Sequence, residues 1–210
     1  PAHHEIGMSL QGLAEIECKR GDFDKAADIL LKAQSIVEKA LGEDNPEVAS
    51  IVHNLGMVRE RQGKYQVANG LYHRALGIRQ RYLGTGHPLV SDTMCALGTL
   101  NFNLRKDANA ELMFNNALDI RMKVFGEKSS KTAEVYACLA ILYDTERKYL
   151  QAEECYRKAI EIRESLWGAD SPKLLRSLQN LAKFLRQHNQ RNSAEFYEAQ
   201  IKRIQEKPTG

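Results

Sequence analysis

The chain has 210 residues, of which 43% are hydrophobic and 27% are charged, a composition typical of a globular protein with enough apolar residues to bury a core. Its formal net charge of +3 is too small to indicate nucleic acid or an acidic membrane surface as a partner. No apolar run approaches the roughly 18 residues that a membrane-spanning helix needs, so no membrane span is expected.

The first residue indicates whether the chain is part of a longer protein, and the cysteines indicate the cellular compartment. The chain begins at Pro1 without a methionine, so we expect a piece cut from a longer protein. The cysteines form no C-x-x-C pair, and each lies in an apolar, helix-like stretch: Cys18, Cys95, Cys138 and Cys155. Buried thiols in a reducing compartment are expected, which favours a cytoplasmic location.

The sequence repeats every 42 residues without an insertion. Segments that open at Pro46, Pro88, Ser130 and Pro172 are evenly spaced, and the same count places the first at His4. We therefore predict a single domain over residues 1–210 that contains five repeats. Their predicted bounds are 4–45, 46–87, 88–129, 130–171 and 172–210.

Each repeat carries apolar and small residues at the spacings of two helices. The first helix has a leucine followed by alanine or glycine, and the leucines are Leu13, Leu55, Leu97, Leu139 and Leu181. The second has an alanine at Ala26, Ala68, Ala110, Ala152 or Ala194, and four units have a bulky residue one turn later, at Leu30, Tyr72, Phe114 and Tyr156. Such spacings mark one face of a helix, and the short side chains mark sites where two helices approach to about 8–10 Å.

Capping residues and glycines agree with these helices in chain order. Asn45, Ser129 and Ser171 are good N-caps before helix starts, and His87 is a poorer one. Glycines end the second helices at Gly42, Gly84, Gly126 and Gly168. The inner turns contain Gly21, Gly63, Arg105, Arg147 and Asn189. Since arginine is a poorer turn former, we expect less sharp inner turns in the third and fourth repeats.

The predicted fold is all-α, an α-solenoid of five helical hairpins, because no strand pattern is present. The order of leucine, small residue, middle alanine and later aromatic resembles tetratricopeptide repeats. Segments such as Asn54-Leu55-Gly56 and Gly63-Lys64-Tyr65 make the 42-residue version similar to the repeats of kinesin light chains and nephrocystin-3-like proteins. The eight residues beyond the usual 34 add about two turns to the second helix.

This resemblance implies a right-handed superhelix whose first helices line a concave, peptide-binding groove. Kinesin light chains often carry paired asparagines there that help to hold a peptide backbone. The first position of the pair reads Gln11, His53, Cys95, Ala137 and Gln179 in this sequence, and asparagine occupies the second at Asn54 and Asn180.

First-helix positions that are not needed for packing are expected to face the groove. Besides the residues just named, they are Glu15, Cys18, Met57, Glu60, Thr99, Phe102, Ile141, Asp144, Lys183 and Arg186. Met57, Phe102 and Ile141 would form an apolar strip with acids at one end and bases at the other, which could hold a partner peptide or helix. Alternatively, neighbouring helices half-cover these side chains and the groove binds nothing.

Charge differs between the repeats. Lysines and arginines minus acids give −4, +4, 0, −2 and +5 from first to last. The fifth repeat carries Arg176, Lys183, Arg186 and Arg191, so the protein partner is expected to have acidic residues near that end. The alternative is a solvated capping repeat, which Glu198, Lys202, Arg203 and Lys207 of the last helix favour.

Catalysis, cofactors and metal sites are not expected, because H-E-x-x-H, P-loop and G-x-G-x-x-G motifs are absent. His3-His4 is interpreted as a terminal remnant. Nucleic-acid binding is disfavoured, since no stacking aromatics are interleaved with the basic residues of the second repeat: Arg59, Arg61, Lys64, Arg74, Arg79 and Arg81. The main rival to a peptide-binding adaptor is a scaffold that self-associates through its terminal repeats, as a homo-oligomer, because no helix precedes the first unit.

Overall fold

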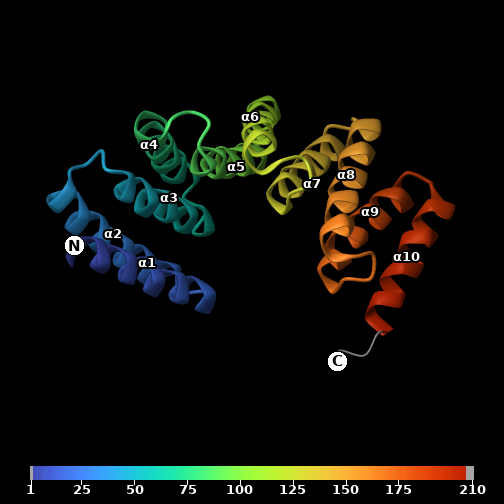
Figure 1. The fold of residues 1–210 in the computed structure, drawn as a ribbon, viewed down its shortest axis with the longest axis horizontal. Coiled ribbons are helices and arrows are strands. Elements are labelled where there is room, and N and C mark those ends of the chain that lie inside the picture. Colours follow the sequence, from blue (N-terminus) through green and yellow to red (C-terminus); the bar gives the residue numbers. More distant parts are fainter. Residues whose placement is uncertain (1, 207–210) are drawn as a thin grey trace. The chain divides into compact units, whose positions relative to one another are not determined.

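The computed structural model describes residues 2–206, and the side chains of residues 5–206, as helices joined by short turns (Figure 1). Over this range the helices are α1 (Ala2–Arg20), α2 (Phe23–Leu41), α3 (Pro46–Arg61), α4 (Tyr65–Leu83), α5 (Pro88–Asn103), α6 (Asp107–Phe125), α7 (Ser130–Thr145), α8 (Tyr149–Trp167), the 3-10 turn η1 (Pro172–Leu174), α9 (Leu175–Gln187) and α10 (Arg191–Glu206). The predicted fold class is confirmed: these elements form five sequential hairpins of a tetratricopeptide-type solenoid. The side chains of His3, His4 and Lys207 lie outside the described residues.

The first helices begin where the capping residues predict. Asn45 Oδ1 accepts from the Glu47 amide at 2.9 Å, and Ser129 Oγ accepts from the Thr132 amide at 3.1 Å. His87 fills the same role, since its Nδ1 accepts from the Leu89 amide at 3.2 Å. An imidazole acceptor therefore replaces the more usual hydroxyl or amide at this helix end.

The helices belong to two compact units, which divide between α5 and α6. The N-terminal unit, up to Lys106, contains α1–α5, and the C-terminal unit, from Asp107, contains α6–α10. This division lies inside the predicted third repeat, residues 88–129. The single-domain organisation and the repeat bounds stay predictions.

The predicted core positions are buried in both units. The five second-helix alanines are completely buried: Ala26, Ala68, Ala110, Ala152 and Ala194. The small residue that follows each first-helix leucine also allows a close helix contact. An added Cβ at Gly56 would lie only 2.8 Å from the Tyr72 ring, so glycine is what allows α3 and α4 to approach at this point.

The first leucine of the predicted stripe is an exception. Leu55, Leu97, Leu139 and Leu181 are at most 3% exposed, whereas Leu13 is 44% exposed. The expectation that Leu13 packs in the core is wrong, because this face of α1 meets no preceding hairpin among the described residues. Its neighbour Ala14 is nevertheless buried, on the side of α1 that faces the core.

The inner turns do not follow the expectation drawn from their residues. Arg105 (φ 59°) and Arg147 (φ 62°) adopt the same left-handed conformation as Gly63 (φ 73°). The amide of Lys106 donates to the Asn101 carbonyl at 2.9 Å, and Lys64 and Lys148 make the matching bond at 2.8 Å in their own turns. The turns are therefore equally tight, and the arginines pay a steric cost of about 1–2 kcal/mol that glycine avoids.

Replacing Leu97 by alanine should lower the free energy of unfolding by about 2–5 kcal/mol, because the side chain is fully buried. Leu13→Ala is the matched control, at the same repeat position with a half-exposed side chain, and should cost less than about 1 kcal/mol. Urea unfolding followed by circular dichroism measures both. A loss below about 0.5 kcal/mol for Leu97→Ala would show that the 42-residue phasing is wrong.

Arg105→Gly should stabilise the chain by up to about 1 kcal/mol, since it relieves the left-handed backbone at a cost in unfolded-state entropy. Gly63→Ala places a Cβ in the corresponding turn and should destabilise by about 1 kcal/mol. Thermal and urea unfolding compare the two variants. Destabilisation by both would mean that the Arg105 side chain contributes more than its backbone conformation costs.

Candidate functional site

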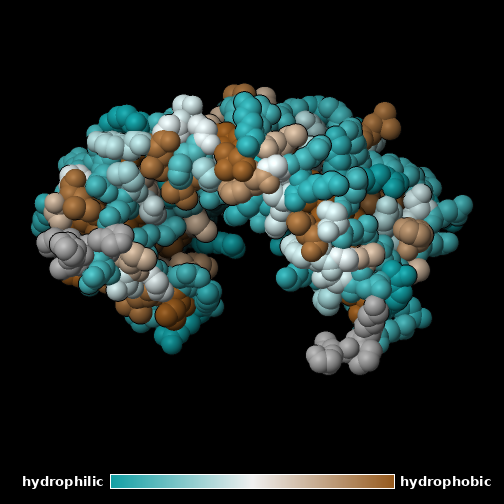
Figure 2. Space-filling view, viewed as in Figure 1, coloured by the Kyte–Doolittle hydropathy of each residue, from teal (hydrophilic) through white to brown (hydrophobic). Residues whose placement is uncertain are grey.

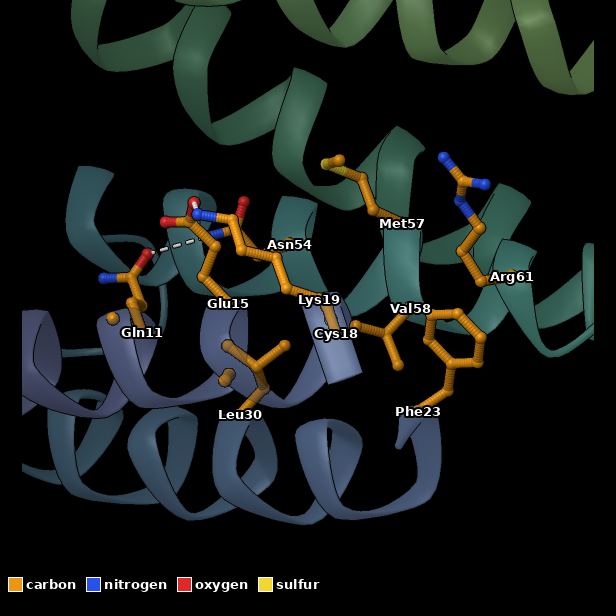
Figure 3. A pocket seen from close by; sticks show the side chains of 12 residues that line it. Gln11, Glu15, Cys18, Lys19, Phe23, Leu30, Asn54, Met57, Val58 and Arg61 are labelled. Atoms are coloured by element: carbon orange, nitrogen blue, oxygen red, sulfur yellow. Dashed lines mark hydrogen bonds and ion pairs between the residues drawn. The ribbon is translucent and has the colours of Figure 1, made fainter. Parts of the chain in front are cut away.

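A cleft of about 560 Å³ lies between α1 and α3 in the N-terminal unit (Figure 3). Its floor is apolar, with Ala14, Leu30 and Val58 buried and Phe23 half-buried at the start of α2. Cys18 lies beside Phe23, and burial raises the pKa of its thiol. The thiol is thus neutral and contributes apolar surface to the floor.

The rim of the cleft is polar and joins the two helices. The Asn54 side-chain amide donates to Gln11 Oε1 at 3.0 Å, as the dashed line in Figure 3 shows. Glu15 pairs with Lys19 at 2.7 Å, and this contact lowers the pKa of the Glu15 carboxyl. The Gln11–Asn54 bond uses only part of the capacity of two amides, so further hydrogen bonds to a ligand backbone are available.

Two longer side chains complete the rim on α3. Met57 is 49% exposed, and Arg61 follows it by one helical turn (Figure 3). The flexible thioether offers apolar contact that adapts to different partners. The guanidinium provides a positive charge at the same end of the cleft as Phe23.

The cleft brings together Gln11, Glu15, Asn54 and Met57 from the predicted groove set, together with Cys18. Sequence reasoning missed its other lining residues, Phe23 and Arg61 among them. Arg61 could have been found, because it lies four positions after Met57 and such residues share a helix face. Phe23 gives no such signal, since it begins the second helix of the hairpin.

Other predicted groove residues of this unit are tied to their neighbours. Glu60 accepts from the Tyr72 hydroxyl at 2.9 Å and from the Asn103 amide at 3.2 Å. On α5, Thr99 is exposed, whereas Cys95 and Phe102 are half-buried. Thr99 and Phe102 are thus accessible in part but line no part of the α1–α3 cleft.

His53, which is predicted as a groove contact, is half-buried. Its Nδ1 is buried without a hydrogen-bond partner, and its ring lies 5.5 Å from the Tyr72 ring. Burial, helped by the charge of Arg79, lowers the pKa of His53 to about 4. The imidazole is therefore neutral near pH 7, and its role as a groove contact stays a prediction.

In the C-terminal unit, Ile141 is 38% exposed on α7, and Asp144 Oδ1 of the same helix lies within hydrogen-bond distance of His188 Nε2, at 3.3 Å. Of the remaining predicted residues, Gln179 and Lys183 are exposed and Ala137 and Asn180 are half-buried. A continuous strip from Met57 to Ile141 would cross from one unit to the other, and it stays a prediction.

The opposite charges of the first two repeats largely pair with one another. Arg74 contacts Glu38 at 2.8 Å and Arg81 contacts Asp44 at 2.6 Å. Arg79 is buried and donates to main-chain and side-chain oxygens of α5. Three of the basic residues of the second repeat are thus engaged within the N-terminal unit, whereas Arg61 and Lys64 are exposed.

The basic fifth repeat also pairs part of its charge. Arg186 forms a two-pronged contact with Glu198, at 2.6 Å and 2.9 Å, and Arg203 contacts Asp170 at 2.6 Å. Arg176 and Lys183 are exposed. Arg186 is exposed as well, but its guanidinium is paired with Glu198.

The cysteines are less buried than predicted. All four are free thiols; Cys155 is buried, whereas Cys18, Cys95 and Cys138 are half-buried. Burial raises the pKa of Cys155 to about 11 and also raises that of Cys138. Thiols of this kind remain protonated and poorly nucleophilic near neutral pH.

Over residues 2–206, no helix is long and apolar enough to cross a bilayer. Among the same described residues, no three histidine, cysteine or acidic side chains gather in a group that could bind a metal ion.

Comparison with known proteins agrees with the hairpin geometry. The family model of the tetratricopeptide repeat matches residues 5–72, 48–123, 102–165 and 131–207. The chain matches no curated protein. Among solved structures, BtubC (BKLC) from P. vanneervenii is 25% identical with a TM-score of 0.84, over 95% of this chain and 81% of that one.

Two more distant structures share the fold. TPR-like repeats of a candidate kinesin light chain from Podosopora anserina are 20% identical with a TM-score of 0.82, over 98% of this chain and 96% of that one. MamA from Desulfovibrio magneticus RS-1 is 14% identical with a TM-score of 0.65, and the match covers 98% of each chain. Since matches to the family model extend over almost the whole sequence, the chain belongs to the tetratricopeptide repeat family.

Proposed function

We propose that this chain is a non-catalytic adaptor that binds a peptide segment of another protein on the groove face of its first helices. Tetratricopeptide repeats are protein-interaction modules, which gives the general class. The α1–α3 cleft is the observation that carries the finer proposal, because it combines an apolar floor with a hydrogen-bonding rim. Such a combination suits an extended peptide, whose side chains alternate with main-chain amides.

The chemistry of the cleft indicates which peptide it would bind. An apolar side chain would lie over Leu30 and Val58, and the peptide backbone would bond to the free groups of Gln11 and Asn54. An acidic residue next to the apolar one would approach Arg61. Exposed Arg176 and Lys183 extend the same preference for acidic partner residues to the fifth repeat.

Likeness to kinesin-light-chain-type repeats supports the adaptor role. BtubC (BKLC) and the Podosopora anserina repeats share this chain's fold over nearly its whole length. An adaptor of this kind would work in the cytoplasm without a cofactor, and its specificity would come from residues on the groove face.

A self-associating scaffold is the second candidate. Ile6, Leu13 and Ile16 favour it, because they expose apolar surface along α1 at the end of the hairpin stack. Sedimentation equilibrium over a hundredfold concentration range decides this candidate, and a constant monomer mass would end it.

Met57→Glu should weaken binding of a cleft peptide at least about tenfold, or about 1.4 kcal/mol, because a carboxylate would replace apolar contact surface beside the floor. The probe is the tightest peptide selected by the wild-type chain from a random displayed library, and its affinity is measured by fluorescence anisotropy. Met8→Glu is the matched control, since Met8 is an exposed α1 methionine outside the cleft.

Arg61→Gln should weaken binding only of peptides that carry an acidic residue, which separates the charge contribution from the apolar one. Circular dichroism establishes that each variant is folded. Equal affinities of wild type and folded Met57→Glu, or selected peptides without an apolar residue in common, would contradict the cleft as the binding site.

A further inference from the structure

The outer face of α1 is an apolar stripe that no other described element covers. Ile6, Leu13 and Ile16 are each more than two-fifths exposed, and Ser9 lies between them on the same helical face. Figure 2 shows hydrophobic residues at the surface of this first hairpin. We call the face formed by Ile6, Ser9, Leu13 and Ile16 the α1 outer face.

The same face is buried in every later repeat. Shifting by 42 residues places Ile6, Leu13 and Ile16 on Val48, Leu55 and Val58 of α3, which are at most 3% exposed. The corresponding residues of the remaining repeats are equally buried: Val90, Leu97 and Leu100; Thr132, Leu139 and Leu142; and Leu174, Leu181 and Phe184. In each case the second helix of the preceding hairpin packs on this face, as α2 packs on α3 and α4 packs on α5.

An arginine marks three of these interfaces; Arg79 and Arg121 are buried and Arg163 is half-buried. Arg79 of α4 donates to the Leu89 carbonyl at 3.0 Å and to Thr93 Oγ1 at 2.6 Å. Arg121 and Arg163 stand at the same repeat position in α6 and α8. Arg121 donates to the Lys131 carbonyl at 2.7 Å.

Arg163 donates to the hydroxyl of Ser177 on α9, which corresponds to Thr93. The interface between α2 and α3 is the exception, because Val37 replaces the arginine and Ile51 replaces the hydroxyl within one buried cluster. An arginine on the second helix therefore accompanies a hydroxyl on the next first helix in two interfaces, Arg121 keeps only the carbonyl bond because Val135 replaces the hydroxyl, and a valine accompanies an isoleucine in the fourth.

Ser9 has the hydroxyl form of this position. Its Oγ donates to the Glu5 carbonyl at 2.8 Å, as Thr93 Oγ1 does to the Leu89 carbonyl at 3.0 Å. The Glu5 carbonyl and Ser9 Oγ thus form the same pair of acceptors that Arg79 uses on α5. The α1 outer face repeats both the apolar residues and the polar acceptors of a covered first helix.

The second helices of another copy of this chain do not supply the complementary helix. Its α2, α4 and α8 already pack on the first helices that follow them, and α6 does so on α7. At the positions of Ala27, Gln34 and Val37 in α2, the last helix α10 carries Glu195, Lys202 and Gln205, all exposed. That surface has no arginine opposite Ser9 and no apolar residues for Leu13.

We propose that the α1 outer face is the receiving half of an inter-hairpin interface. Its occupant is the second helix of a further tetratricopeptide hairpin, in the preceding position of the 42-residue frame, with an arginine that reaches Ser9 Oγ and the Glu5 carbonyl. The partner is thus defined by its chemistry: an apolar, small-residue helix face with one cation at a fixed position.

The test supplies such a hairpin. A copy of residues 46–87 is joined directly before residue 4 of the full chain, so that its arginine precedes Ser9 by the 14 positions that separate Arg79 from Thr93. Hydrogen exchange of the α1 amides, followed by mass spectrometry, should slow at least about tenfold. Unchanged exchange beneath a hairpin that circular dichroism shows to be folded would overturn the proposal.

Two control variants separate the apolar and polar parts. Leu13→Glu with Ile16→Glu in α1 should abolish the added protection, because two carboxylates cannot be buried beneath the new helix. Arg79→Ala in the added copy alone should remove part of it. Full protection in the presence of the two glutamates would also overturn the proposal.

The chain without the added hairpin tests whether a second copy covers the α1 outer face instead. Sedimentation velocity should show a monomer whose mass does not change with concentration. A dimer that Leu13→Glu dissociates would assign the α1 outer face to self-association and overturn the proposed hairpin. Peptide affinity at the α1–α3 cleft is measured separately, so either result leaves the proposed function to its own test.

Discussion

The burial of the first helices α3, α5, α7 and α9 beneath the second helix of the hairpin before each is the contact on which the remaining structure depends. A single hairpin has too little interior to hide both of its apolar faces, so one face is always left for a neighbour. Leu55, Leu97, Leu139 and Leu181 are buried in this way. Packing uses one side of these helices and leaves positions on the predicted groove face, such as Met57, accessible.

Much of the fold could be predicted because the same constraints recur in each repeat. A single window with an Ala26-like residue would have indicated only an amphipathic helix, whereas five aligned alanines indicate a fixed helix crossing. The exposure of Leu13 could not be predicted from periodicity, which identifies a packing face without showing what covers it. The left-handed Arg105 and Arg147 were missed for a related reason: the surrounding helices determine the turn, and the side chain adapts to it.

The candidate site was predicted in part. Gln11, Asn54 and Met57 occupy first-helix positions, so their shared location follows from helical geometry and the repeat frame. Phe23 comes from the second helix, and its contribution depends on how the hairpin closes. The neutral state of His53 could not be predicted from its helix face, because it depends on partial burial beside the Tyr72 ring.

The buried arginines bind main-chain carbonyls, and this determines which mutations preserve their hydrogen bonds. Arg79 and Arg121 each bind a backbone carbonyl ten positions further along the chain, which every residue type provides. Substitutions on the receiving helix therefore leave that bond in place, whereas a residue inserted in the connecting loop would change the ten-residue separation between the arginine and its acceptor. Amino-acid substitutions on these helices should therefore be tolerated more often than changes in loop length, because the loop sets the spacing between successive hairpins.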